Sequence, residues 1–278
     1  MNTILKRTLL SSLVLPFALG VQSASADMIT NWDYSVASSF VDFGSSSGDG
    51  AVVASETDHV LSWGTTADKS SVRITDASGS DLVTGGDYVS GGSFTHTNNV
   101  IWATDAALTS FDLKTALTLT PTAPVGPTFD LPPVTFNGFF KETPNRLGSC
   151  VAAATGPACD DIFTVANVGA LGSTVTTDDL GNSFLEFSQM FTLGDGFDYT
   201  VFLKLAGLTF LDPDACDAAS AGAGCVGLLT EENKVSTFDT EFRITAAATQ
   251  VPEPGTMALL GLGLAGLGLS RRKKAAKS

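Results

Sequence analysis

The chain has 278 residues, of which 44% are hydrophobic and 16% are charged, and its formal net charge is −14. The central part, residues 27–250, contains only eight of the 15 basic residues but 28 of the 29 acidic ones, so it carries a charge of −20. This surface repels nucleic acid, which excludes a nucleic-acid partner, and it favours divalent cations. About 224 central residues suffice for one all-β domain or two small ones.

The first 26 residues have the pattern of a secretory signal peptide. Lys6 and Arg7 precede the apolar stretch Leu9–Val21, and the small residues Ala24–Ala26 follow it. We therefore expect export by the general secretion machinery and cleavage by signal peptidase between Ala26 and Asp27.

Residues 27–244 show apolar side chains at every second position, which is typical of strands with one buried face. Glycine-rich turn signals separate the alternating segments, and we find no convincing amphipathic helix. Many short strands at this spacing predict an all-β fold, a β-sandwich or a jelly-roll-like pair of sheets. We expect at least two of the three tryptophans in its core. The clearest alternating segments are Trp32–Val36, Phe111–Leu119, Leu185–Leu193, Phe197–Leu205 and Phe238–Ile244.

Two segments bear on domain organisation. Thr120–Pro133 contains five prolines and no periodicity. We interpret it as a crossing within a single domain, although it could also separate two smaller halves. The short segment 245–250 reads as a tether between the domain and the C-terminal tail.

Four cysteines form two pairs with identical spacing, Cys150 with Cys159 and Cys216 with Cys225. An even number in an exported chain indicates disulfides, and four cysteines allow three connectivities. We favour local pairing, in which each bond fastens the tip of a long hairpin. The spacings do not match zinc-binding patterns, and no histidine is nearby.

Candidate catalytic and metal-binding residues are few. His59 and His96 are the only histidines, and no acid/base pair can be located, so we expect no enzymatic activity. Asp212, Asp214 and Asp217 have the alternating carboxylates of a weak calcium site, with calcium as the only candidate cofactor. The alternative is a solvated acidic loop.

The last 28 residues, 251–278, have three parts that together suggest a sorting signal. The residues Pro252, Glu253 and Pro254 keep the backbone extended and open to a protease. The uncharged run Thr256–Leu269 would span only roughly 21 Å as a helix, which makes it a marginal, short transmembrane segment. A basic stop then holds the C-terminus in the cytoplasm; it consists of Arg271, Arg272, Lys273 and Lys274.

This tail resembles the PEP-CTERM signal that exosortases recognise in Gram-negative bacteria that produce exopolysaccharide. Two internal motifs also resemble the THxN family of PEP-CTERM proteins, namely Thr95–Asn98 and the later segment Gly224–Asn233. That family has no assigned activity. His96 and Asn98 face the same side of a strand or loop, where they would either satisfy backbone groups or contact a ligand or metal.

The resemblance implies an exosortase as partner, a transient inner-membrane intermediate and a final location at the cell surface or in the extracellular matrix. We therefore expect a non-enzymatic component of an exopolysaccharide layer or biofilm. The alternative is an extracellular module that binds glycan, such as the host's exopolysaccharide, or calcium.

Overall fold

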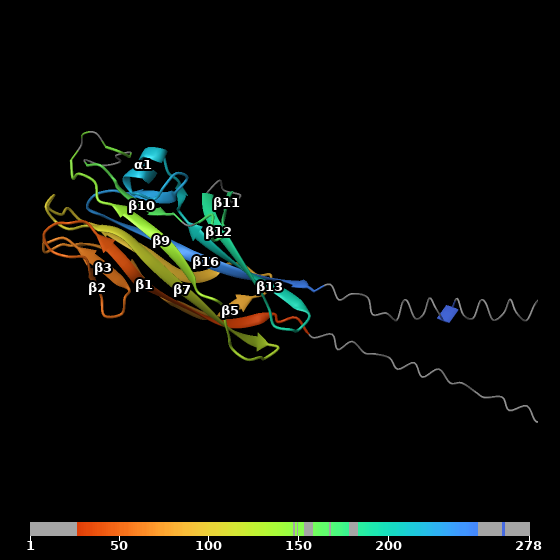
Figure 1. The fold of residues 1–278 in the computed structure, drawn as a ribbon. Helices are drawn as coiled ribbons and strands as arrows, with labels where there is room; N and C mark the ends of the chain where they lie inside the picture. Colours follow the sequence, from red (N-terminus) through yellow and green to blue (C-terminus); the bar gives the residue numbers. More distant parts are fainter. Residues whose placement is uncertain are drawn as a thin grey trace, which may run out of the picture.

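The computed structural model describes residues 27–146, 148, 150–152, 158–166, 168–177, 183–249 and 263–264. Two antiparallel sheets of eight strands each dominate this part of the chain and face each other in an elongated molecule (Figure 1). The prediction of an all-β fold is confirmed, and the two layers are consistent with a β-sandwich.

The first sheet has the strand order β14-β15-β10-β9-β7-β1-β5, with β8 paired to β7. The most extensive strand pairing in this sheet is between the two long strands β1 and β7, which pair along almost their whole length. The strands are β1 (Asn31–Ser45), β5 (Ala77–Val83), β7 (Leu108–Ala123), β8 (Phe129–Asp130), β9 (Val134–Lys141), β10 (Asp161–Val165), β14 (Thr209–Phe210) and β15 (Val226–Thr230).

The second sheet has the order β11-β12-β13-β16-β6-β4-β3-β2. The long strand β16 lies at its centre between β13 and β6. The strands are β2 (Val53–Ala54), β3 (Val60–Trp63), β4 (Ser70–Ile74), β6 (Val89–Asn98), β11 (Thr174–Thr177), β12 (Ser183–Thr192), β13 (Phe197–Ala206) and β16 (Lys234–Ala248).

The core lies between the sheets, because each sheet turns its alternate apolar side chains inward. Edge-to-face rings join the layers at Trp32 and Tyr199, whose centroids are 5.3 Å apart, and Phe94 packs on Phe163 at 4.8 Å. Trp32 and Trp63 are fully buried, whereas Trp102 is exposed. The expectation that at least two tryptophans lie in the core is therefore confirmed.

Two local predictions need correction. The segment predicted as a tether from residue 245 is still strand as far as Ala248, because β16 pairs with β13 up to Phe197 opposite Ala248. A short helix, α1 (Pro213–Ala218), also interrupts the chain where no helix was predicted. Asp212 takes an extended N-cap conformation and Pro213 opens the first turn, which is a favoured combination at a helix start.

The proline-rich segment Thr120–Pro133 leaves β7 and returns to it, because β8 pairs with β7 at Leu119 and Phe129. Strands from before and after this segment occur in both sheets. The segment therefore connects β7 to β9 within the first sheet and does not cross to the second, while a single domain stays a prediction.

Both ends of the described domain lie at one end of the sandwich. The amide of Ile29 donates to the hydroxyl of Tyr199, and the amide of Thr249 donates to the carbonyl of Gly196. From there β16 runs back to Lys234 at the other end, which we call the distal end. At about 3.3 Å per residue, its 15 residues place the distal end roughly 45 Å from the point where the chain leaves toward its tail.

Candidate functional site

Three carboxylates meet at the distal end, and the strand register explains how two of them come together. Glu142 directly follows β9, and Asp161 is the first residue of β10. Ile162 pairs with Lys141 in the antiparallel ladder, so the next position along places Asp161 opposite Glu142. Two residues 19 positions apart in the chain thus become neighbours.

The third carboxylate, Glu232, lies in the tight connection that carries the chain from β15 in the first sheet to β16 in the second. Thr230 pairs with Asp161 at the end of β15, so Glu232 emerges beside the same strand end. Asn233 completes the connection with a φ of 57°, a left-handed conformation that asparagine tolerates better than most residues. The crossover therefore holds Glu232 at the corner between the sheets.

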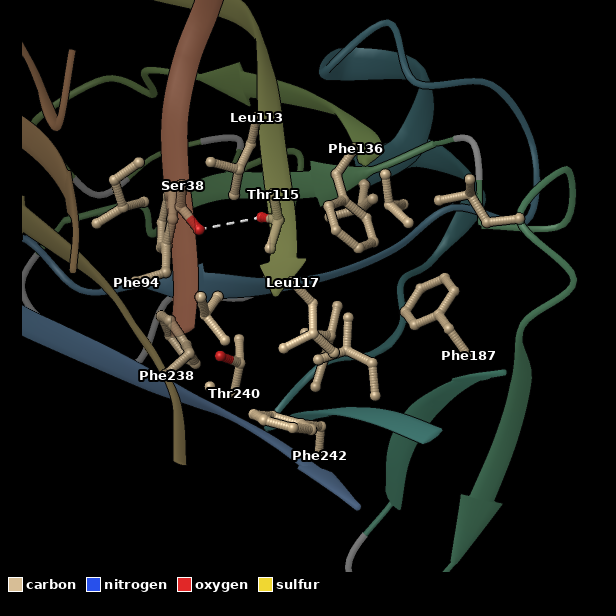
Figure 2. Close-up of a pocket in the computed structure, with 18 of the residues that line it drawn as sticks. Ser38, Phe94, Leu113, Thr115, Leu117, Phe136, Phe187, Phe238, Thr240 and Phe242 are labelled. Carbon is tan, nitrogen blue, oxygen red and sulfur yellow. Dashed lines mark hydrogen bonds between the residues drawn. The ribbon is translucent and has the colours of Figure 1, made fainter. Parts of the chain in front are cut away.

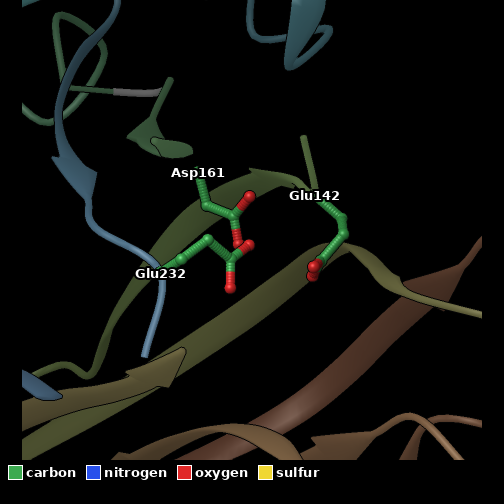
Figure 3. Close-up of side chains that lie close together, drawn as sticks. All are labelled: Glu142, Asp161 and Glu232. Carbon is green, nitrogen blue, oxygen red and sulfur yellow. The ribbon is translucent and has the colours of Figure 1, made fainter. Parts of the chain in front are cut away.

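The three side chains point toward one another (Figure 3), and one ligand atom from each lies within 4.8 Å of the others. Trp63 Nε1 donates to Glu142 Oε2 at 3.1 Å, and the Thr143 amide donates to Asp161 Oδ1 at 2.7 Å. The remaining oxygens, Glu142 Oε1, Asp161 Oδ2 and both oxygens of Glu232, are buried without a hydrogen-bond partner. None of the three residues is in an ion pair with a basic residue of the described chain.

This environment disfavours negative charge. Burial, reinforced by the charge of Asp161, raises the pKa of Glu142. Burial also raises the pKa of Asp161, although the hydrogen bond from the Thr143 amide partly offsets the rise. Burial raises the pKa of Glu232 to about 7. Carboxyl groups in such a site either retain protons or require a cation.

His96 and Asn98 line the same end of the sandwich from the second sheet. His96 Nδ1 lies 3.0 Å from Thr230 Oγ1, and Asn98 Nδ2 donates to the Thr230 carbonyl at 3.2 Å. The Thr230 hydroxyl can donate to the Asp161 carbonyl at 3.4 Å, so its oxygen accepts the Nδ1 proton of His96. Burial lowers the pKa of His96 to about 3, so the ring is neutral and its Nε2 carries a lone pair.

The two histidines lie in different parts of the structure. His59 lies near the surface, where its Nε2 is 3.2 Å from Asp76. His96 is buried between Trp63, whose ring is stacked on it at 5.9 Å, and Phe140. His96 and Asn98 both contact Thr230, and each also has one unpartnered polar atom, His96 Nε2 and Asn98 Oδ1.

A second internal space, an apolar cavity of about 310 Å³, lies between the sheets (Figure 2). Several of the polar side chains that line it are paired with other groups of the protein. Ser38 Oγ and Thr115 Oγ1 are 3.1 Å apart and share a hydrogen bond, and Thr240 Oγ1 donates to the Gly92 carbonyl. The cavity thus offers apolar contact but few groups that could orient a polar substrate.

The predicted calcium residues do not converge. Asp212 caps α1, Asp214 lies in its first turn and Asp217 lies one turn further on. Within the described chain, the group of acidic residues close enough to share an ion is Glu142, Asp161 and Glu232. Asp212, Asp214 and Asp217 are therefore not among the groups of described residues that could share an ion.

The cysteines pair locally. Cys150 is bonded to Cys159 in the connection between β9 and β10, and Cys216 is bonded to Cys225 between β14 and β15. In both cases the flanking strands are antiparallel partners, so each disulfide closes the end of a hairpin, as the spacing predicted. The first of them closes the loop that joins Glu142 to Asp161.

The sequence reasoning missed Glu142, Asp161 and Glu232. They are scattered through the chain without a ligand spacing, and only the register of β9, β10 and β15 unites them. A usable signal existed in the segment Thr230–Asn233, where a polar Thr-Glu-Glu-Asn run interrupts two strands.

The predicted terminal signals lie outside the described residues. These are the signal-peptide site at Ala26, the sorting residues Pro252, Glu253 and Pro254, and the basic stop from Arg271 to Lys274. Within the part of the chain that the structure describes, no helix combines the length and apolarity needed to cross a membrane.

The fold and tail define an all-β protein with a C-terminal sorting signal. Residues 250–273 match the family model of the PEP-CTERM protein-sorting motif. This motif implies export, sorting at the membrane and processing by an exosortase. No curated protein matches the chain.

Proposed function

We propose that the mature protein is a non-catalytic component of the cell surface or of the exopolysaccharide matrix of a Gram-negative bacterium. The observation that carries this proposal is the match of residues 250–273 to the PEP-CTERM protein-sorting motif. Signal peptidase would cut before Asp27, and an exosortase would cut near Pro252–Pro254 and release the domain from the inner membrane.

Several features of the domain support an extracellular destination. The charge of −20 over residues 27–250 favours solubility, and the two disulfides suit an oxidising compartment. The motif Thr95–Asn98 and the segment Gly224–Asn233 are the basis for proposing the THxN family. They meet at the distal end, where His96 contacts Thr230.

The contacts of the two histidines support a non-enzymatic role. His96 is 1% exposed and its hydroxyl partner Thr230 is equally buried, so a substrate has no access to them. His59 interacts with Asp76 and with the carbonyl of Thr57 rather than with a nucleophile.

The intact mass of the protein recovered from its own host tests the proposal. We expect a chain that begins at Asp27 and ends close to Pro252–Pro254, with the added mass of any attached group. Deletion of the exosortase should retain the tail in the membrane fraction. The variant Glu253→Ala tests the motif, with Glu231→Ala as a control in the domain. A tail left uncut in cells with an active exosortase would contradict the proposal.

A further inference from the structure

We propose that Glu142, Asp161 and Glu232 bind one calcium ion, which joins the two sheets at the distal end of the sandwich. This inference does not depend on the sorting of the tail, because the three residues belong to the folded domain. It also differs from the calcium site predicted at Asp212, Asp214 and Asp217.

The donor atoms suit a hard cation. Four carboxylate oxygens at this site are buried and have no hydrogen-bond partner, and the group as a whole has no basic counterion among the described residues. Calcium binds carboxylate oxygens at about 2.3–2.6 Å, so ligands on opposite sides of the ion lie up to about 5 Å apart. The separation of 4.8 Å or less between the three ligand atoms fits this range.

A second observation, the deep burial of two of these side chains, points to the same ligand. Asp161 is 0% exposed and Glu232 is 4% exposed, and the unpartnered oxygens of both side chains face the cluster. Leaving such an oxygen buried and unpaired is costly, and a cation in the cluster would remove that cost.

The origin of the ligands indicates what the ion does. Glu142 and Asp161 extend from strands of the first sheet, and Glu232 lies in the crossover that leads to β16 of the second sheet. Glu142 is half-buried and is the most exposed member of the cluster. Binding would therefore hold together the two layers at the end farthest from the tail, in the extracellular medium where calcium modules commonly have dissociation constants of about 10⁻⁴–10⁻³ M.

The test uses the mature protein secreted by its host, with CaCl₂ as the probe. Isothermal titration calorimetry measures the stoichiometry and the dissociation constant, and thermal unfolding is followed in CaCl₂, in MgCl₂ and in EGTA. The variant Glu232→Gln removes one ligand charge but keeps the size of the side chain. The variant Glu231→Gln makes the same change at the adjacent residue and is the matched control.

We expect one calcium ion per chain and a rise in the unfolding midpoint of about 5–10 °C at 100 times the dissociation constant. Glu232→Gln should weaken binding by more than about 100-fold, beyond the 10–100-fold typical of residues that only orient a ligand. In EGTA it should be at least as stable as the unmodified protein, because it removes a carboxyl group whose ionisation is disfavoured by burial. This result shows that the variant folds.

Three results would overturn the inference. One is the absence of both heat and stabilisation when folded protein meets 10-fold to 100-fold more calcium than the expected dissociation constant. Another is equal calcium affinity in Glu232→Gln and Glu231→Gln. An equal response to MgCl₂ would overturn the choice of calcium, since magnesium requires a tighter octahedral site. A failure of tail processing would leave all three results unaffected.

Discussion

Two regions of the sandwich differ in how their polar groups are satisfied. Most of the wall of the cavity is apolar, and its Ser38 and Thr115 pair with each other. At the distal end, Glu142, Asp161 and Glu232 face one another, and four of their oxygens lack partners. The cavity lies between the two sheets, whereas the cluster lies at two strand ends and in a crossover connection.

The two regions therefore differ in what determines their contribution to the free energy of unfolding. Loss of packing around the cavity costs free energy under any condition, because the apolar contacts that are lost do not depend on protons or cations. The free energy of the carboxylate cluster depends on what neutralises it, either protons or a cation. A change of pH or of ion concentration should therefore act on the distal end and leave the cavity unaffected. Three experiments test this contrast.

The largest effect is expected for Phe111→Ala in the wall of the cavity. Phe111 is buried, its ring is packed against Phe40 and Phe163, and a Cβ at Gly138 would lie only 2.4 Å from its Cζ. Removing this ring enlarges the cavity and should lower the free energy of unfolding by about 3–5 kcal/mol. Chemical denaturation measures the loss, which should be the same in calcium and in EGTA.

The matched control is Phe210→Ala, because Phe210 is 63% exposed. It should change the free energy of unfolding by less than about 0.5 kcal/mol. If the loss in Phe111→Ala depended strongly on calcium, the two regions would be coupled and the contrast between them would fail.

The second expected effect is a dependence of the free energy of unfolding on pH, which arises from the carboxylate cluster. In calcium-free buffer the folded state holds protons on the three carboxyl groups that the unfolded chain has already released above about pH 4.5. The folded state binds more protons, so the free energy of unfolding falls as the pH rises toward the folded pKa values. For Glu232, whose pKa is raised to about 7, the fall is on the order of 3 kcal/mol.

Denaturation curves in EGTA between pH 5 and pH 9 measure this slope. Glu232→Gln should flatten it, because glutamine does not titrate, whereas Phe111→Ala should leave it unchanged. A stability that rose over this range in calcium-free buffer would show that burial does not raise the carboxyl pKa values.

The smallest effect compares the two disulfides. Each closes a loop of about ten residues, so replacing either pair by serine should lower the free energy of unfolding by about 2–3 kcal/mol. Only the bond between Cys150 and Cys159 lies in the connection from Glu142 to Asp161. Its removal should also weaken calcium binding in calorimetry, whereas removal of the bond between Cys216 and Cys225 should not. Equal affinity in both double variants would show that the first loop does not position the cluster.

Local sequence patterns predicted much of the fold. The alternation in segments such as Phe197–Leu205 predicted strands because one face of each is buried, and the equal cysteine spacings predicted two local bonds. The predictions failed where neighbours along the chain did not decide the outcome. The partner strand β13 extended β16 to Ala248, and a helix begins at Pro213 in a segment interpreted as an acidic loop.

The carboxylate cluster could not be predicted from the sequence for a different reason. Glu142, Asp161 and Glu232 are separated by 19 and 71 positions in the printed sequence, and none of them has a motif of its own. His96 and Asn98 were found because they lie within one short motif, but their partner Thr230 lies 132 positions after Asn98. Such a pairing leaves no periodic pattern in the sequence, because it depends on which strands become neighbours.

The linear sequence alone established the exported destination and the alternating strands, because a sorting signal and a strand face are read from adjacent residues. The tail at 250–273 is recognised in this way without any knowledge of the fold. The arrangement of the strands in two sheets, the apolar cavity and the meeting of three buried carboxylates were decided by tertiary structure. The physical reason is that register and crossover connections bring distant residues together, and burial then changes what their side chains can bind.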